Sequence, residues 1–170
     1  MTIIRPARIR DAEQLARVFN PYVGIATMVL QARSAADYLP LLESKRCAVL
    51  VAEAGDRVVG YASVKPYSLR AGYARSAEVS VFLAEAATGL SIGQQLYDAL
   101  FPQATALGYQ HFTARIWGEN AGSVRFHARN GFRMVGRQEK IGFVHERWVD
   151  VVLMERFIPT APTPPPPPGV

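Results

Sequence analysis

The chain has little cysteine and no long apolar run, and each shortage excludes a class of protein. Cys47 is the only cysteine, so no internal disulfide can form, which agrees with a reducing compartment. No apolar run approaches the length of a membrane span, and the segment Met1–Pro6 lacks the apolar core of a signal peptide. We therefore expect a cytoplasmic protein with no membrane partner.

The charged residues form no block of one sign. Lys and Arg exceed Asp and Glu and give a formal net charge of +5, but the cations are scattered along the chain. A basic run would favour nucleic acid, whereas this pattern indicates a mild attraction for anions such as a nucleotide cofactor. We expect no nucleic-acid partner and no metal site.

What is present is one globular domain followed by a proline-rich end. A chain of 170 residues is long enough to build a single substantial core, and we assign residues 1–158 to that domain. From Pro159 the composition changes, and the run Pro164–Pro168 cannot supply sheet hydrogen bonds. Residues 159–170 are predicted to form a solvated, extended tail, with docking to a partner as the alternative.

Hydrophobic periodicity predicts a mixed α/β order of elements. Helix starts are indicated at Asp11 (in a capping-box pattern), Ser34, Ser91 and Asn120. The helix from Ser91 to Leu107 contains Pro102, so either it kinks there or it ends sooner. Strands are expected at Ile3–Ile9, Cys47–Glu53, Arg57–Lys65, Ala77–Leu83, His111–Ile116, Phe132–Arg137 and Trp148–Phe157.

Residues 77–93 carry the most informative pattern. A strand with one carboxylate is followed by the turn Thr88-Gly89-Leu90-Ser91-Ile92-Gly93, which leads into a helix. Free backbone N–H groups at a helix start bind phosphate oxygens, and Gly89 and Gly93 would permit a close approach. An ordinary loop that needs glycines for turning explains the same residues equally well.

Glu78 is the carboxylate of that strand. Alternation places it on one face with Ser80 and Phe82, while Val79 and Val81 point to the other face. A carboxylate in the middle of a strand is unfavourable unless its face opens on a polar cleft or an arginine pairs with it. An ion pair is therefore the structural alternative, and the position just before the predicted anion-binding turn favours a functional role.

Several short motifs follow one another at consistent spacing over about residues 3–157. They are Ile9-Arg10-Asp11-Ala12, Asn20-Pro21-Tyr22-Val23, Val59-Gly60-Tyr61-Ala62, Glu78-Val79-Ser80-Val81, Gly118-Glu119-Asn120-Ala121-Gly122-Ser123, Gly131-Phe132 and Gly142-Phe143-Val144-His145, with His127, Trp148 and Asp150. The ordered set resembles the GNAT N-acetyltransferases, in the branch of phosphinothricin and methionine sulfoximine acetyltransferases. The resemblance implies a mixed α+β fold, with a mostly antiparallel twisted sheet flanked by helices and a V-shaped opening for acetyl-CoA.

The resemblance also implies an activity, in which acetyl-CoA is the donor and the α-amine of a small amino acid or analogue is the acceptor. Only a neutral amine attacks a thioester, and a carboxylate that is shielded from water can accept the amine's proton. By resemblance, Glu78 is this general base, and His145 lies at the substrate. His127 is a candidate for protonating the departing thiolate, with a half-buried helix histidine as the alternative.

Further residues take their roles from the same resemblance. Backbone N–H groups near Val81, Phe82 and Leu83 would hold the thioester carbonyl and the pantetheine arm. Thr88, Gly89, Leu90, Ser91, Ile92 and Gly93 would hold the pyrophosphate, and Asn120 and Ser123 would lie near the pantetheine, with helix capping as the alternative for Asn120.

On the acceptor side, Arg70 would pair with an acidic group of the substrate and Tyr73 would donate a hydrogen bond to it. A homodimer is implied, while Trp148 and Asp150 are given structural roles.

The chain departs from the family pattern in the turn and on the acceptor side, where Thr27-Met28-Val29 replaces a segment that contains Phe or Trp in relatives. Thr88 and Ser91 stand where the family has Arg or Gln and then Gly, so we expect a weaker affinity for the cofactor. Ser68 stands where relatives have Lys or Arg, which removes one cationic partner for an acceptor with two acidic groups. An acetyl-CoA-binding protein that acts as a sensor, or that acetylates another amine, is the alternative function.

Overall fold

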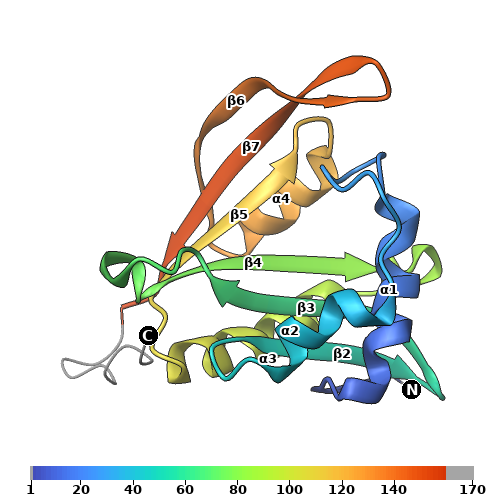
Figure 1. The fold of residues 1–170 in the computed structure, drawn as a ribbon. Helices are drawn as coiled ribbons and strands as arrows, with labels where there is room; N and C mark the ends of the chain where they lie inside the picture. The colour runs from blue at the N-terminus through green and yellow to red at the C-terminus, as the bar shows by residue number, and fades with distance from the viewer. Residues whose placement is uncertain (1, 160–170) are drawn as a thin grey trace.

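One twisted sheet of seven strands organises residues 2–159, which the computed structural model describes (Figure 1). The strand order is β1-β2-β3-β4-β5-β7-β6, and every neighbouring pair is antiparallel except β4 and β5. The strands are β1 (Thr2–Pro6), β2 (Ala48–Ala54), β3 (Arg57–Pro66), β4 (Ser76–Leu83), β5 (His111–Trp117), β6 (Arg133–Val144) and β7 (Arg147–Phe157). The predicted tail lies outside the described residues, apart from Pro159.

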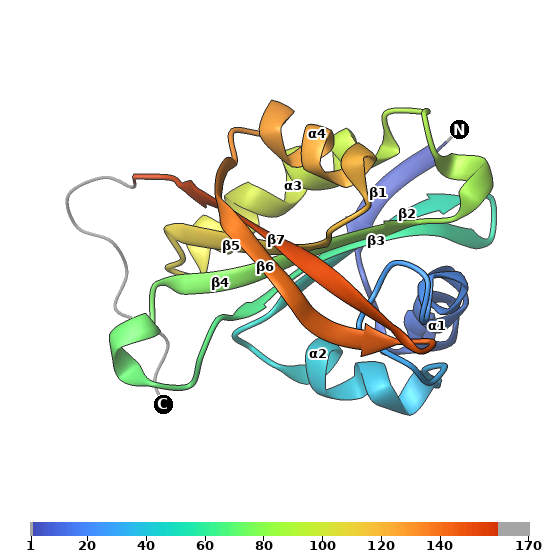
Figure 2. The same ribbon diagram turned by 90° about the horizontal axis from the view of Figure 1, so that it is seen from above.

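Helices cover both faces of the sheet. Seen from above, α3 and α4 lie on one side of the strands, and α1 and α2 lie on the other (Figure 2). Leu96, Tyr97 and Leu100 of α3 belong to one buried cluster, whereas Leu15 and Phe19 of α1 belong to a second. The sheet is therefore the middle of three layers, as the resemblance implies. The helices are α1 (Ala12–Phe19), α2 (Leu39–Glu43), α3 (Ile92–Ala106) and α4 (Ala121–Arg129).

The first helix begins differently from the prediction. The first strand ends at Pro6 and not at Ile9, because Ile9–Asp11 form a 3-10 turn. The Asp11 carboxylate makes no cap of α1; it accepts the backbone N–H of Arg8 at 2.7 Å and also pairs with Arg5. The capping-box pattern thus marks the right region, but the carboxylate serves the turn that precedes the helix.

The structure settles the extent of two later elements, α3 and β6. Helix α3 passes through Pro102 to Ala106, and Gly108 follows it with a φ of +93°, so the proline does not end the helix. Strand β6 continues past Arg137 to Val144, with register shifts against β7 on the way. Those shifts break the two-residue alternation by which a strand is recognised in a sequence.

The sheet opens between its two parallel strands. Strands β4 and β5 pair only from Ser76 to Glu78 with His111 to Thr113, although β4 runs on to Leu83 and β5 to Trp117. Beyond Glu78 the two strands diverge, as Figure 1 shows. This divergence is the V-shaped opening expected from the resemblance. Among residues 2–159, no helix combines the length and apolar character needed to cross a bilayer.

Candidate active site

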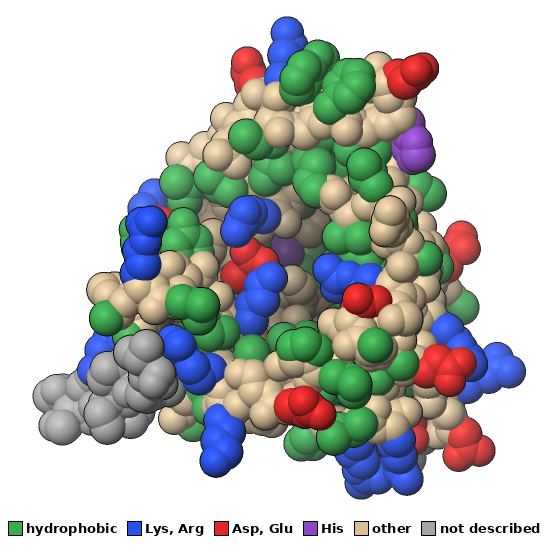
Figure 3. Space-filling model, viewed as in Figure 1, with side chains coloured by type: hydrophobic (Ala, Val, Ile, Leu, Met, Phe, Trp, Pro, Cys, Tyr) green, Lys and Arg blue, Asp and Glu red, His purple; other side chains and the backbone are tan. Residues whose placement is uncertain are grey.

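A cavity of about 630 Å³ occupies the opening between β4 and β5. Figure 3 shows the corresponding hollow in the molecular surface, with acidic and basic side chains at its mouth. Its lining comes from both faces of the sheet, so the opening joins two compartments. One compartment is lined by residues such as Phe19, Tyr22, Met28, Arg33 and Tyr38, and the other by Ile116, Trp117, Asn120, Ser123 and His127.

Glu78 lies in this lining and is held by two cations. Its Oε1 is 3.0 Å from Nζ of Lys65 on β3, and its Oε2 is 2.8 Å from Nη2 of Arg115 on β5. The side chain of Glu78 is 16% exposed, and both cations also line the cavity. The ion pair that the sequence left as the alternative is therefore present. Because Glu78 also lines the cavity, the ion pair and a functional role are compatible.

Register explains why these three side chains meet. Lys65 is the cross-strand partner of Glu78 in the β3–β4 ladder, and Thr113 is its partner in the β4–β5 ladder. Arg115 lies two residues beyond Thr113, on the same face of β5, so its guanidinium reaches back across the opening. The last pairs of β4 and β5 thus fix the carboxylate at the apex of the V.

The backbone of β4 offers hydrogen-bonding groups to the opening. Ala84 N donates to Val59 O at 2.8 Å, and Tyr67 N donates to Ser76 O at 3.0 Å, so the even-numbered residues of β4 bond to β3. The odd-numbered Val79, Val81 and Leu83 therefore direct their N–H and C=O groups towards the gap.

Of the three strand residues predicted to hold the cofactor, Val81 and Phe82 line the cavity, whereas Leu83 does not. The N–H of Phe82 belongs to the β3 ladder, so it is not free to bind a ligand. At the end of the gap, Tyr22 donates its hydroxyl to Leu83 O at 2.6 Å.

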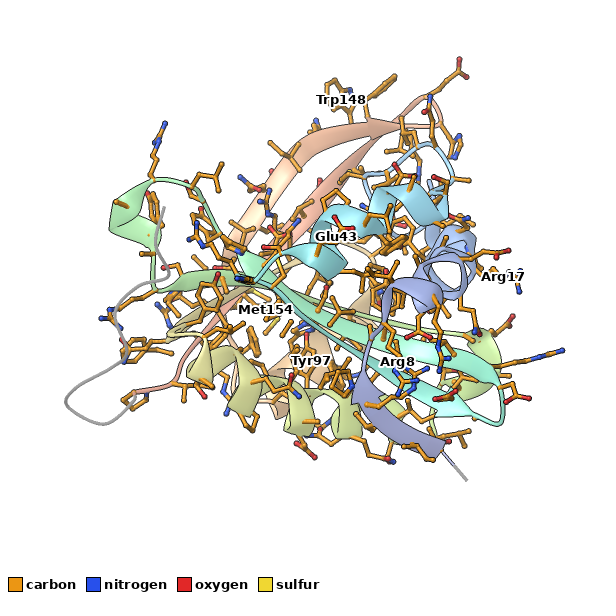
Figure 4. All side chains as sticks on the ribbon, turned by 60° about the horizontal axis from the view of Figure 1, so that its bottom comes forward. Arg8, Arg17, Glu43, Tyr97, Trp148 and Met154 are labelled. Atoms are coloured by element: carbon orange, nitrogen blue, oxygen red, sulfur yellow. The ribbon has the colours of Figure 1, made fainter. Side chains whose placement is uncertain are left out.

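His127 is a buried histidine with both ring nitrogens occupied. The Ser123 carbonyl can only accept, so Nδ1 carries the proton and donates to it at 2.8 Å. The Tyr97 hydroxyl then donates to Nε2 at 2.9 Å, and burial lowers the pKa of the imidazole. Figure 4 shows Tyr97 lying between α3 and the sheet. The ring lines the cavity, but this arrangement leaves it no free N–H, which favours the packing interpretation.

Three other predicted residues lie outside the cavity lining. Arg70 and Tyr73 are on the exposed connection between β3 and β4, where the Tyr73 ring packs on Tyr67 with centroids 5.2 Å apart. His145 begins the β6–β7 turn with a φ of +47°, and its ring covers Gly24, where a Cβ atom would lie 2.6 Å from Nε2. The structure does not bring these three side chains to Glu78.

The predicted anion-binding turn leads into α3, as expected, and also lies outside the cavity lining. Gly89 and Ser91 adopt left-handed conformations, with φ of +76° and +60°, and Leu90 is exposed. The first N–H groups of α3, from Ile92, have no acceptor within the helix. Gly93 is buried, and a Cβ atom there would lie 3.3 Å from Phe126 of α4, so its lack of a side chain serves helix packing.

The two α4 residues predicted near the cofactor do line the cavity. Asn120 Oδ1 accepts the backbone N–H of Ser123 at 2.9 Å, which is the helix-capping arrangement. Asn120 and Ser123 thus line the cavity in which the cofactor is expected, and Asn120 also caps α4. Within residues 2–159, no cluster of three or more His, Cys, Asp or Glu side chains could hold a metal ion.

Trp148 and Asp150 do not enter the site. Asp150 accepts Arg137 Nε at 2.7 Å and the backbone N–H of Lys140 at 2.8 Å, which secures the irregular part of β6. Trp148 stands at the exposed end of the β6–β7 hairpin, where its ring packs on Phe143 (Figure 4). Both positions agree with the structural roles expected for them.

Sequence reasoning missed most of the compartment on the α1 side. Arg33 lines it with its guanidinium carbon 4.1 Å from the Phe19 ring centroid, and the Tyr38 and Tyr61 hydroxyl groups are 3.0 Å apart. Arg33 follows an irregular segment without periodicity, so no local signal marks it. Tyr61 belongs to a recognised motif, but its contact with Tyr38 depends on how the 3-10 turn Ala35–Tyr38, which precedes α2, packs on the sheet.

Comparison with known proteins gives a consistent result along the chain. The acetyltransferase (GNAT) domain family matches residues 4–153. The phosphinothricin N-acetyltransferase of Streptomyces coelicolor is 32% identical over 161 residues, which cover 90% of this chain and 94% of that enzyme. The L-methionine sulfoximine/L-methionine sulfone acetyltransferase of Pseudomonas aeruginosa is 30% identical over 160 residues, which cover 89% and 92% of the two chains.

A solved structure shares the same fold. The phosphinothricin acetyltransferase of Sinorhizobium meliloti, in complex with AcCoA, superposes with a TM-score of 0.85. Its sequence is 29% identical, and the match covers 95% of this chain and 93% of that one.

Proposed function

Because the chain belongs to the GNAT acetyltransferase family and is an acetyl-CoA-dependent N-acetyltransferase, we propose that its acceptor is the α-amino group of a small amino acid or analogue. The named substrates of the similar enzymes, phosphinothricin and methionine sulfoximine or sulfone, support this class of acceptor. The observation that carries the proposal is the location of Glu78, at the point where one cavity passes through the sheet.

The residues around the opening fit the donor. When bound, acetyl-CoA supplies an acetyl thioester whose carbonyl carbon an amine can attack. The inward N–H groups of Val79 and Val81 suit the thioester carbonyl and the amides of the pantetheine arm. Asn120 and Ser123 line the same compartment, and the start of α3 offers free N–H groups and a positive dipole end for phosphate oxygens.

Glu78 is the proposed general base. An amino acid carries an ammonium group near neutral pH, and its nitrogen attacks only after losing a proton. The Glu78 carboxylate can accept that proton directly or through a water molecule. Lys65 and Arg115 bind both carboxylate oxygens and so fix their positions at the cavity. We assign His127 to packing, because its two ring nitrogens are bonded to Tyr97 and Ser123.

We further propose that the protein acts in the cytoplasm as a homodimer, with residues 1–158 as the catalytic domain and 159–170 as an extension. The single cysteine supports a reducing compartment, and the resemblance to the phosphinothricin branch supports the dimer. Light scattering coupled to size-exclusion chromatography tests the dimer, since a monomeric mass at micromolar concentration would contradict it.

A panel of amines tests the proposed acceptor class. The purified protein, acetyl-CoA and each amine are incubated, and free thiol and N-acetyl product are both measured. We expect the highest kcat/KM for one or more α-amino acids or their analogues. Turnover confined to amines without an α-carboxylate would reject this class, and tight binding of acetyl-CoA without turnover of any amine would favour a sensor.

A further inference from the structure

The charged side chains of the cavity are unevenly matched. Within the described part of the chain, the lining contains three cations, Arg33, Lys65 and Arg115, and one carboxylate, Glu78. Glu78 binds Lys65 and Arg115, whereas the ion pairs found among residues 2–159 do not include Arg33, whose charge is within electrostatic reach of the exposed Asp37 carboxylate. The cavity therefore keeps a positive charge at Arg33 that a ligand can neutralise.

The position of Arg33 is fixed before any ligand arrives. Its backbone N–H donates to Asn20 Oδ1 at 2.8 Å, and its carbonyl accepts Asn20 Nδ2 at 3.0 Å, so its main chain is tied to the end of α1. Its guanidinium carbon lies 4.1 Å from the ring centroid of Phe19 and 5.6 Å from that of Tyr38. Contacts with ring faces hold a guanidinium while leaving its edge free to donate hydrogen bonds.

The surroundings strengthen any anion contact made there. Arg33 is half-buried in the compartment that contains Phe19 and Tyr38, and both of those side chains are buried. Charge-assisted hydrogen bonds are stronger where water is partly excluded, and the planar guanidinium matches a carboxylate with two parallel bonds. Glu78 lines the same cavity, so a carboxylate bound at Arg33 lies in the cavity that the proposed base faces.

We propose that Arg33 binds the α-carboxylate of the acceptor and thereby selects amino acids over amines that lack this group. The inference rests on the proposed function, because it assigns a residue to an acceptor of that class. Arg70, the residue expected from the sequence to bind an acidic group of the substrate, stays a separate prediction, since it lies on the exposed β3–β4 connection outside the cavity lining.

The test compares an amino acid with its carboxamide, which keeps the amine and removes the negative charge. The amino acid is the best acceptor found in the amine panel. Steady-state kinetics are measured for wild type, Arg33→Met, Arg33→Lys, Arg70→Met and Arg17→Met. Arg17 is the matched control, since it lies on the outer face of α1 with a side chain that is 71% exposed (Figure 4).

For Arg33→Met we expect kcat/KM for the amino acid to fall by about 10- to 100-fold, mainly through KM, because a hydrogen-bonded ion pair is lost. The value for the carboxamide should change by less than about threefold, since that substrate never formed the pair. Arg33→Lys should recover part of the lost kcat/KM, because it restores the positive charge but not the pair of parallel hydrogen bonds that a guanidinium donates. Arg17→Met and Arg70→Met should keep the wild-type ratio of the two substrates.

An unchanged substrate ratio in Arg33→Met, or a collapse of the ratio in Arg70→Met, would overturn the inference while leaving the proposed function intact. Wild-type turnover of amines but of no α-amino acid would reject both. The melting temperature and the acetyl-CoA affinity of each variant report folding, and the Lys variant keeps the comparison usable if Arg33→Met is unstable.

Discussion

Arg115 on β5 binds the Glu78 carboxylate on β4 at 2.8 Å, across the point where these two strands stop pairing. One contact thus joins the two arms of the V and sets the direction of the only carboxylate in the cavity lining, within the described residues. Arg115 can act in two ways: it can stabilise the fold, or it can position the Glu78 carboxylate. The melting temperature reports the first effect and kcat reports the second.

Replacement of Arg115 by Met should lower kcat by about tenfold, because the carboxylate loses one of the two contacts that orient it. The melting temperature should change little, since the Arg115 side chain is 58% exposed and exposed ion pairs contribute at most about 1 kcal/mol. Arg133→Met removes the exposed pair with Glu155 elsewhere on the sheet and is the matched control. Equal kcat values for the two variants would show that Arg115 does not position Glu78.

His127 should give the fold a dependence on pH. Burial lowers the pKa of its imidazole from the ordinary 6.5, so the unfolded chain takes up a proton more readily than the folded one. The associated stability is complete above about pH 6.5 and decreases as the pH falls below it. Urea unfolding between pH 5 and 8 should therefore show a steeper pH dependence for wild type than for His127→Gln. Identical slopes would contradict the buried, neutral assignment.

Ser91 has the left-handed conformation that glycine adopts most readily, with a φ of +60°, at a position where the family pattern has glycine. A residue with a side chain is disfavoured there by about 1–2 kcal/mol. Ser91→Gly should raise the acetyl-CoA affinity and keep or increase the melting temperature, whereas Ser91→Val, which is β-branched, should lower both. Calorimetric titration with acetyl-CoA measures the affinities. Unchanged binding by the Val variant would show that this turn does not contribute to binding of the cofactor.

The order of strands and helices was predictable because its signals are local. Alternating apolar residues, the hairpin at Gly55 and the cap at Asn120 each act within a few residues, and the structure has the corresponding elements. The end of β6 was missed, because register shifts near Gly136 and Gly142 interrupt the alternation.

The site was predictable only where a motif carried it. Glu78 and Asn120 lie in recognised motifs, and both line the cavity. The partners of Glu78 were hidden, because Arg115 is 37 residues away and meets it only through the β4–β5 register. Arg33 was hidden as well, since its place in the cavity depends on bonds between its backbone and Asn20 that no periodicity reveals.

The proton acceptor is the central element of this account, and Glu78→Gln tests it most directly. The amide keeps the size of the side chain but cannot take a proton, so kcat/KM for the best acceptor at neutral pH should fall by about 100-fold or more. The acetyl-CoA affinity and melting temperature should stay close to wild type, and the defect should shrink as the pH rises and more of the amine is neutral. Turnover equal to wild type at neutral pH, in a folded variant that binds acetyl-CoA normally, would contradict the account.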